Sequence, residues 1–311
     1  MRIIFVFCCL LPMLITQAQN QVAISMDDLP FLQWPGDTPL AKLKASNERL
    51  LNVIKAKGVP VAIFTNEVNV DTPEKEAILK QWLHNSMITA GNHSYAHKNF
   101  NQTTNAEFES EILKGEKLTK KLLKGTNKQL SYFRFPFNAT GNDSTSRFAM
   151  EKFLSKNGYV LTPFTVESSD WLLNSLYLDA LNKNDLEKAK TVGEYYVKYT
   201  LEVFEYFEKL SRSEFGYNIK HIYLCHDNEL NADYFGQLID KLKERSYSFI
   251  SLEDALKDQA YQSKDYYIGP SGMSWFYRWK KDPAVQQELL RSSPDPDGKL
   301  LKEYQALTSK R

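Results

Sequence analysis

The chain lacks the features that would assign it at once to a specialised class of protein. It has three cysteines in 311 residues, and lysine plus arginine (39) nearly balance aspartate plus glutamate (38), for a net charge of +1. It contains no basic arm, acidic tail, internal repeat or low-complexity stretch. The balanced charge gives no electrostatic basis for binding nucleic acid. The length predicts one or two globular domains with a large core.

Apolar runs long enough to cross a membrane are also missing. The most apolar segment, Ile3–Ile15, follows Arg2 and precedes the small-x-small sequence Thr16-Gln17-Ala18. This segment is shorter than the roughly 20 residues that span a bilayer. We therefore predict a secretory signal peptide over residues 1–18, with an uncleaved anchor as the alternative. The mature chain, from residue 19, is predicted to reach the periplasm or the extracellular space without a membrane span.

Cysteine is scarcer still once the signal is removed. Cys8 and Cys9 lie inside the apolar run, so Cys225 would be the single cysteine of the mature chain. One cysteine cannot form an internal disulfide, and a core of this size does not need one. Cys225 lies in an apolar segment, which favours a small buried hydrophobe over a reactive thiol.

Strand-like and helix-like segments alternate along the chain. Strands are predicted over Val22–Met26, Val59–Thr65, Met87–Gly91, Tyr132–Phe135, Tyr159–Val166, Ile219–Cys225 and Tyr247–Ile250. Helices are predicted over Leu40–Lys57, from Pro73 onward, and over 104–124, Ser144–Asn157, Asp185–Ser211, Ala232–Arg245 and Leu252–Ala260. This alternation implies an α/β fold with a parallel sheet and helices outside it, as a barrel or an open sheet.

Residues 263–311 break this alternation. They contain a cluster of aromatic residues, namely Tyr266, Tyr267, Trp275, Phe276, Tyr277 and Trp279, followed by a charged tail. We expect a C-terminal extension that packs on a domain formed by residues 19–262, with a helix near Pro283–Arg291. Burial against the domain is favoured for Trp275 and Trp279, and stacking on a sugar is the alternative.

Polar residues follow several of the predicted strands. Asp27 and Asp28 end the first strand, and His93, Arg134, Asp170 and His226 fall at or just after the ends of later ones. In barrels, the carboxyl ends of the strands gather catalytic groups from distant parts of the chain. Core packing alone does not explain such repeated placement, so we predict an active site at this face.

The residue types at these positions suit a metal site. His93 and His97 are four residues apart, so on a helical turn both rings would face the same way. Alone this spacing is a weak signal, and surface or capping histidines are the favoured interpretation. An adjacent pair of acids changes the balance, because zinc commonly takes two imidazoles and one carboxylate and leaves a position for water.

The two aspartates need different partners, because adjacent carboxylates repel each other. At a strand end both can enter one site, where one would bind a cation and the other would pair with Arg134. A turn or helix cap is the alternative for the aspartates, and a surface ion pair is the alternative for Arg134. His226 would act as a general acid if Asp170 holds its ring, whereas a core or cap histidine is the alternative.

Together, five segments resemble the polysaccharide deacetylases of carbohydrate esterase family four over residues 22–255. The segments are Ser25-Met26-Asp27-Asp28-Leu29-Pro30, His93-Ser94-Tyr95-Ala96-His97, Arg134-Phe135-Pro136-Phe137, Ser169-Asp170-Trp171 and Leu224-Cys225-His226. Each is weak alone, but five in the family's order form a strong signal. The resemblance implies a distorted (β/α) barrel with about seven strands.

The resemblance also implies roles for individual residues. Asp28, His93 and His97 would hold a divalent metal, Zn²⁺ by preference with Co²⁺, Mn²⁺ or Ni²⁺ as alternatives. Asp27 would be the general base, oriented by Arg134, and His226 the general acid, oriented by Asp170. The backbone N–H of Phe137 would help bind the oxyanion, and Trp171 and Leu224 would shape the acetyl pocket.

Two departures from the family pattern fall in loops. Leu29 and Asn138 stand where the family usually has glycine. Both cost more than glycine in a left-handed or crowded turn, so these loops are expected to differ from those of other members.

The function implied is secreted, metal-dependent removal of N- or O-acetyl groups from a carbohydrate. The substrate would be an acetylated glycan, such as a chitooligosaccharide, peptidoglycan or xylan. Two other functions are weighed against it. One is deacylation of a small non-sugar amide by the same site, and the other is an inactive glycan-binding module.

Overall fold

A computed structural model of the chain describes residues 20–31, 38–270 and 272–309. The predicted signal peptide, residues 1–18, lies outside the described residues. Within the described ranges, no helix is both long enough and apolar enough to cross a membrane.

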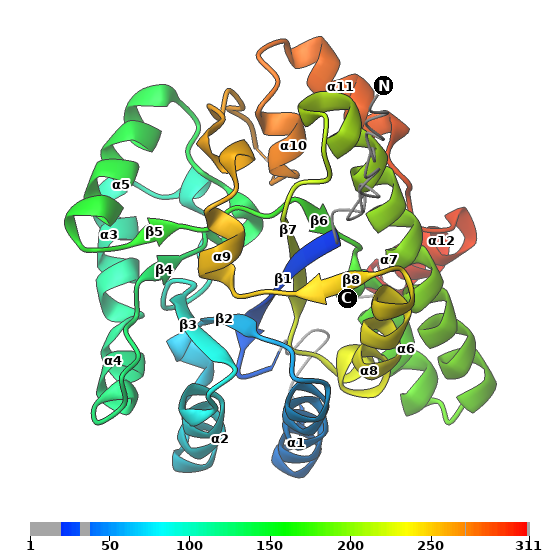
Figure 1. Ribbon diagram of the computed structural model, residues 1–311. Helices are drawn as coiled ribbons and strands as arrows, with labels where there is room; N and C mark the ends of the chain where they lie inside the picture. Colours follow the sequence, from blue (N-terminus) through cyan, green and yellow to red (C-terminus); the bar gives the residue numbers. More distant parts are fainter. Residues whose placement is uncertain (1–19, 32–37, 271, 310–311) are drawn as a thin grey trace, which may run out of the picture.

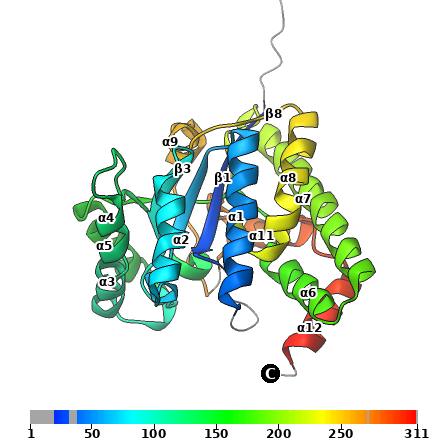
Figure 2. The same cartoon turned by 90° about the horizontal axis from the view of Figure 1, so that it is seen from below.

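The core of the fold is a curved parallel sheet with helices on its outer side (Figures 1 and 2). Its strands are β1 (Asn20–Leu29), β2 (Val61–Thr65), β3 (Ile88–Asn92), β4 (Tyr132–Phe133), β5 (Val160–Leu161), β6 (Val166–Glu167), β7 (His221–His226) and β8 (Tyr247–Phe249). Seven of them follow one another in the order β5-β4-β3-β2-β1-β7-β6, and β8 pairs with the beginning of β1. The seven strands curve into a half-barrel, which confirms the predicted distorted (β/α) barrel over the open sheet.

The sheet does not close between β5 and β6. The single strand predicted over Tyr159–Val166 is in fact these two short strands, which pair with different neighbours, β4 and β7. Pro163 lies between them and has no N–H to donate to a ladder, which interrupts the strand. The half-barrel therefore opens at this point.

Helices cover the outside of the half-barrel (Figure 2). They are α1 (Leu40–Lys57), α2 (Pro73–His84), α3 (Asn105–Lys114), α4 (Lys117–Leu123), α5 (Ser144–Lys156), α6 (Asp170–Asn182), α7 (Leu186–Phe215) and α8 (Glu229–Glu244). Helix α9 (Leu252–Leu256) instead packs against the inner face of the sheet through Leu252 and Ala255. The helix predicted over 104–124 is divided at Gly115. A Cβ atom there would lie 2.5 Å from the carbonyl carbon of Ser94, so the chain bends where it touches the segment that follows β3.

The side chains of β1 alternate between two environments, as a strand's period of two requires. Val22, Ile24 and Met26 pack in the main core towards the helices. Ala23 points the other way, into a small cluster with Phe64 and Leu252. Small side chains on this inner face leave room inside the half-barrel for larger polar ones.

Three more helices lie in the described part of the C-terminal extension, residues 263–270 and 272–309. These are α10 (Trp275–Arg278), α11 (Pro283–Ser292) and α12 (Gly298–Thr308). Phe276 and Tyr277 join the main core, and α12 lies against α6 (Figures 1 and 2). Trp275 is buried and packs with Phe164, while Trp279 packs edge-on against Phe215, so both tryptophans pack against the domain.

Candidate active site

The end of β1 brings two carboxylates into the half-barrel. Asp27 lies on the same inner face as Ser25, two residues earlier, and is 2% exposed. Asp28 would point outward in a regular strand, but the pairing with β2 shifts between Met26 and Leu29 and Asp28 has a φ of 65°. This irregularity turns Asp28 toward the site, so both acids lie in one cavity.

Asp27 forms a buried ion pair with Arg134. The Arg134 side chain is fully buried, and its Nη1 lies 2.8 Å from both Asp27 Oδ1 and Ser25 Oγ. The rest of its guanidinium donates to the carbonyl oxygens of Thr162 and Pro163. A bonded, buried guanidinium fixes the position of the carboxylate. The alternative of a surface ion pair for Arg134 is therefore wrong.

His93 faces both aspartates through one ring nitrogen. Its Nδ1 lies 2.8 Å from the carbonyl oxygen of Arg134, which can only accept, so Nδ1 carries the proton of the neutral ring. The lone pair of Nε2 then faces Asp28 Oδ1 at 3.6 Å and Asp27 Oδ2 at 3.7 Å. Burial and the neighbouring His97 ring lower the pKa of His93 to about 3. His93 is therefore neutral at pH 7, as a metal ligand must be.

His93 and His97 do not lie on a helical turn, contrary to the prediction. They belong to a loop in which Ser94 and His97 have positive φ angles of 66° and 52°. The N–H groups of Tyr95 and Ala96 donate to the carbonyl and carboxylate oxygens of Glu111 on α3. These bonds replace those of a helix and bring the two imidazole centroids within 5.0 Å of each other.

Asp28, His93 and His97 form a cluster suited to a cation. One ligand atom from each lies within 4.8 Å of the others. Asp28 Oδ1 is 3.3 Å from Nε2 of His97, and among the described residues it is buried without a hydrogen-bond partner. A buried carboxylate oxygen left without a donor is costly, and a cation would satisfy it. Two imidazoles and a carboxylate are also a common ligand set for zinc, so the residues present fit a divalent metal.

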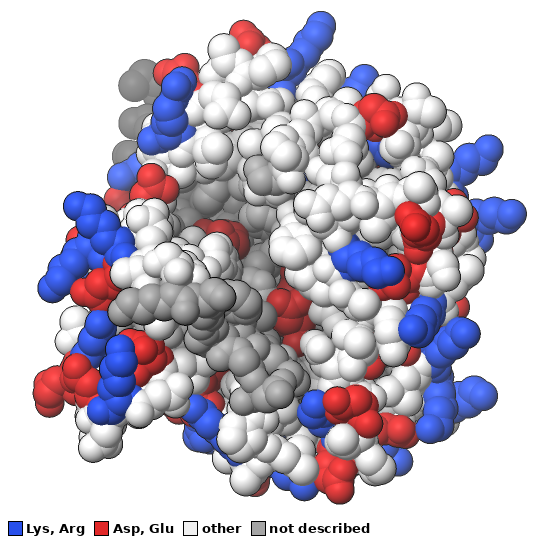
Figure 3. All heavy atoms as spheres, turned by 180° about the vertical axis from the view of Figure 1, so that it is seen from behind, with Lys and Arg blue, Asp and Glu red and all other residues white. Residues whose placement is uncertain are grey.

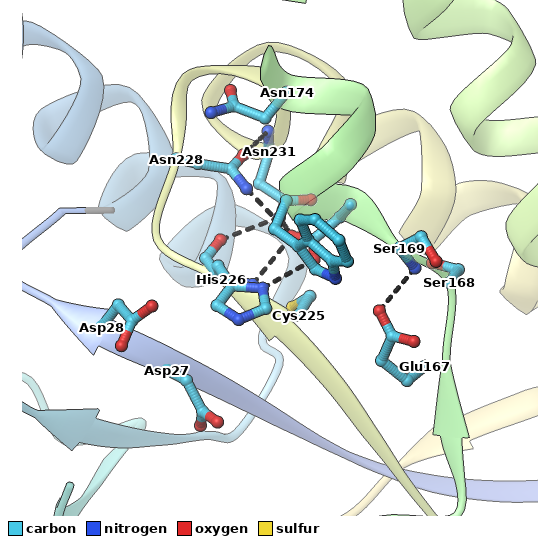
Figure 4. A network of polar contacts seen from close by, with 12 residues as sticks. Asp27, Asp28, Glu167, Ser168, Ser169, Asn174, Cys225, His226, Asn228 and Asn231 are labelled. Atoms are coloured by element: carbon cyan, nitrogen blue, oxygen red, sulfur yellow. Dashed lines mark hydrogen bonds and ion pairs between the residues drawn. The ribbon is translucent and has the colours of Figure 1, made fainter. Parts of the chain in front are cut away.

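A second polar cluster surrounds His226 at the end of β7. Its Nδ1 lies 2.7 Å from Oδ1 of Asp170, which is fully buried at the start of α6. Asn228 and Asn231 donate to the other oxygen of Asp170, as does the backbone N–H of His226. Figure 4 shows His226 between these amides and the two aspartates of β1. His226 is therefore held in one orientation by a carboxylate whose two oxygens both accept hydrogen bonds.

The pKa of His226 is shifted upward. Burial alone would lower this pKa, but the charge of Asp170 and its hydrogen bond outweigh burial, and Asp28 and Asp27 add to the effect. The result is a pKa of about 10. His226 therefore carries a proton at neutral pH, as a general acid requires.

The two clusters share one cavity of about 720 Å³. Eight of the ten predicted site residues line it, namely Asp27, Asp28, His93, His97, Phe137, Trp171, Leu224 and His226. Arg134 and Asp170 lie behind this lining and bond to Asp27 and His226. The structure thus brings all ten together. Figure 3 shows a hollow on this side of the molecule with acidic side chains inside it.

The three predicted substrate-contacting residues differ in exposure. Phe137 is 54% exposed, has a φ of 57°, and places its ring 4.5 Å from that of His97. Trp171 is 37% exposed at the other side of the cavity. Leu224 is buried and packs with Phe164 and Trp275. The cavity is therefore lined by apolar groups around a polar centre, which is typical of a small-molecule site.

Several residues of the site carry no sequence signal of their own. Asn228 and Asn231 read as ordinary helix-start residues, although their amides hold Asp170. Glu167 also lines the cavity, and burial together with the charge of Asp170 raises its pKa to about 7. The extension contributes three lining residues, Pro270, Gly272 and Tyr304. Only the fold reveals the contacts of the two asparagines and of the extension, because their partners are far away in the sequence.

The interpretation of Cys225 as a buried hydrophobe agrees with its environment. The side chain is fully buried in β7, and burial raises the pKa of its thiol. Its sulfur is 3.6 Å from the carbonyl oxygen of Ser25 and does not line the cavity. A thiol in such surroundings is inert.

Comparisons with known proteins point to one family. The family model for polysaccharide deacetylase matches residues 15–154. A chitin deacetylase from the fungal pathogen Colletotrichum lindemuthianum is 20% identical, with a TM-score of 0.54 over 77% of this chain and 88% of that one. No curated protein matches the chain.

Two further solved structures are mutants of a CE4 family pseudoenzyme from Bacillus anthracis. One is 17% identical, with a TM-score of 0.52 over 77% of this chain and 68% of that one. The other, a mutant with restored enzymatic activity, is 18% identical, with a TM-score of 0.50 over the same shares. At these identities the solved structures establish the fold alone. The family match over residues 15–154 and this fold confirm the resemblance carried by the five motifs: the chain is similar to the polysaccharide deacetylases.

Proposed function

We propose that this protein is an exported, metal-dependent hydrolase that removes acetyl groups from a carbohydrate. The observation that carries the proposal is the pairing of two clusters across one cavity. On one side, Asp28 Oδ1 and two imidazoles converge, and that oxygen has no hydrogen-bond partner within residues 20–31, 38–270 and 272–309. On the other, a protonated His226 is held by Asp170. Metal-assisted hydrolysis requires a bound cation and a general acid close to the same substrate group.

Asp28, His93 and His97 would hold the metal, and zinc is the ion that this ligand set suits best. When bound there, such an ion supplies Lewis acidity to an acetyl carbonyl and lowers the pKa of water. His93 is ready for this role, because its Nδ1 proton is directed to the carbonyl oxygen of Arg134 and its Nε2 faces the site. Orientation of a ligating imidazole through its other nitrogen is usual in metal proteins.

Asp27 is placed to act as the general base. Its Oδ1 is bound to Arg134, while its Oδ2 faces His93 and the cavity. Asp27 would accept a proton from the attacking water, and the bond to Arg134 would keep the carboxylate in position. Proton transfer of this kind contributes about 10²–10⁴-fold to a rate.

His226 would deliver a proton to the departing nitrogen or oxygen. This proton sits on Nε2, because Nδ1 is engaged by Asp170, and it allows a neutral amine or alcohol to leave. The products are acetate and the deacetylated sugar. The backbone N–H of Phe137 is our candidate for oxyanion binding, and Trp171 and Leu224 would shape the acetyl pocket.

Two other functions use the same fold. A non-sugar amide would suit the same chemistry, but the predicted export signal favours a glycan, because glycans are common substrates outside the cell. An inactive glycan-binding module is the second, and similarity to a pseudoenzyme makes it a serious candidate. The complete pair of clusters disfavours it, since an inactive module has no use for a poised general acid.

The test is acetate release by the purified mature protein. Acetylated xylan, chitooligosaccharides and peptidoglycan fragments are each incubated with enzyme that has been treated with a chelator and then reloaded with Zn²⁺, Co²⁺, Mn²⁺ or Ni²⁺. We expect acetate from at least one glycan, loss of release after chelation, and recovery on reloading. Release from a small non-sugar amide alone, or binding of glycan without acetate, would contradict the proposal. The substrate that responds also distinguishes N- from O-deacetylation.

A further inference from the structure

The C-terminal extension fills the opening of the half-barrel. Ser274 Oγ donates to the carbonyl oxygen of Thr165 at 2.7 Å, and the N–H of Trp275 donates to that of Phe164 at 3.0 Å. Both acceptors lie in the interruption between β5 and β6, where the sheet fails to close. Figure 1 shows α10 beside this interruption. The extension therefore completes the wall that the sheet leaves open.

A buried charge network anchors the extension to the loop that carries Phe137. Arg278 is fully buried and pairs with Asp265, which also binds Arg147 at 2.9 Å. The Arg278 guanidinium also donates to the Thr140 hydroxyl at 2.6 Å and to the Asn138 carbonyl oxygen at 3.2 Å. Moving this segment away would leave a charged group buried without its partners, which is strongly unfavourable. The wall is therefore a fixed part of the site.

The first contact of the wall with the cavity is at Pro270 and Gly272. A Cβ atom on Gly272 would lie 2.2 Å from the carbonyl oxygen of Phe137, so the two backbones touch. No larger residue fits without moving one of them. The extension thus lies directly against the proposed oxyanion loop.

The second contact is made by α12. Tyr304 lines the cavity, and its ring meets that of Trp171 edge-on, with 5.6 Å between centroids. Trp171 follows β6, the strand at one end of the sheet row, and Phe137 follows β4, next to β5 at the other end, so both residues lie near the opening that the extension fills. The extension reaches the cavity beside each of them.

We infer that the extension restricts the enzyme to short acetylated oligosaccharides or chain ends, at the expense of internal units of long polymers. The inference rests on the proposed function. An internal unit needs a groove that is open on two opposite sides of the reacting centre, because the chain must enter and leave. Here the extension places cavity-lining residues beside Phe137 and beside Trp171, which narrows the cavity at two points. A cavity of about 720 Å³ is within the range that encloses one small ligand. Aromatic rings such as Trp171 and Tyr304 offer apolar faces for a sugar.

The test compares kcat/KM on an acetylated oligosaccharide with that on the polymer of the same sugar, using the full mature protein loaded with Zn²⁺. Wild type should prefer the oligosaccharide by at least about tenfold per acetyl group. Tyr304→Ala should raise KM for the oligosaccharide by about tenfold, as loss of one pocket contact does, with little change in kcat. Activity on the polymer should stay constant or rise.

Lys302→Ala is the matched control, because Lys302 lies on the exposed face of the same helix. Equal or better activity of wild type on the polymer would overturn the inference, as would an equal loss on both substrates in Tyr304→Ala. Circular dichroism and melting temperature of each variant separate a local effect from unfolding. If wild type releases acetate from neither substrate form nor from any other glycan, the proposed function fails and the inference falls with it. Acetate release without a length preference removes the inference alone.

Discussion

Two histidines that line the cavity, the buried His93 and the partly buried His226, show opposite protonation. His93 and His226 are both deeply placed, yet the pKa of His93 is lowered to about 3 and that of His226 is raised to about 10. The difference between the two pKa values follows from the group that accepts a hydrogen bond from Nδ1 of each ring. A neutral carbonyl oxygen faces that atom in His93, and the Asp170 carboxylate faces it in His226. The partner, more than burial, therefore decides whether an imidazole serves as a metal ligand or as an acid.

The adjacent aspartates divide their work in the same way. Asp27 is bound by a buried guanidinium, whereas Oδ1 of Asp28 has no hydrogen-bond donor in the part of the chain that the structure describes. One carboxylate is satisfied by the protein and the other is left for a cation. Each half of the site thus contains one group fixed from within and one group directed at the cavity.

Of the substitutions that test this comparison, removal of the His93 side chain should lower activity the most. His93→Ala deletes one of three predicted ligands, and the charge stabilisation that a metal supplies is worth several kcal/mol. Since each 1.36 kcal/mol is tenfold in rate, we expect kcat/KM to fall by more than about 10³-fold. Metal content, measured on the purified protein by elemental analysis, should fall in parallel.

The control for this change is His84→Ala. His84 is exposed at the end of α2, away from the cavity, and should keep both metal and activity. Full metal occupancy in His93→Ala would show that the ion is bound elsewhere, and the contrast between the two imidazoles would lose its meaning.

Asp27→Asn should have the next largest effect. The amide keeps the shape of the side chain and can still accept from Arg134, but it cannot take a proton. We expect kcat to fall by about 10²–10⁴-fold while metal content stays at the wild-type level. Single-turnover rates and elemental analysis of the same sample measure both. An equal loss of metal would place Asp27 among the ligands and merge the two roles that the structure separates.

The fold could be predicted from the sequence because the local signals for helices and strands agree with the regular alternation of strand and helix along the chain. Helix α1 begins and ends where predicted, at Leu40 and Lys57, since Gly58 takes the left-handed conformation that ends a helix. Boundaries failed where long-range contacts override local preference. Gly115 divides a helix because it touches Ser94, which no local pattern reveals. Helix α6 was not predicted, although Asp170 begins it.

The site could be predicted in its residues but not in its surroundings. The motifs identified the groups that bear chemistry, because those groups follow strands that meet at one face. One prediction from spacing was wrong: His93 and His97 do not lie on a helical turn. A loop that is hydrogen-bonded to Glu111 brings their rings together. Tyr304 and Gly272 were missed as site residues, because their place depends on how a distant segment packs.

Asp170→Asn should have the smallest effect on rate and the most specific effect on pH dependence. The substitution removes the charge and hydrogen bond that raise the pKa of His226, so burial, which lowers this pKa, gains weight. A general acid works only while protonated, and activity is lost as pH rises through its pKa. The alkaline limb of the kcat–pH profile should therefore move to lower pH, with part of the lost rate recovered on acidification. The loss at neutral pH should stay near the lower end of the range of about 10²–10⁴-fold that general acid catalysis provides. Asp240→Asn, on the exposed side of α8, should leave the profile unchanged. An unmoved alkaline limb in Asp170→Asn would mean that the carboxylate merely holds the ring, and protonation of His226 would no longer explain why the two imidazoles differ.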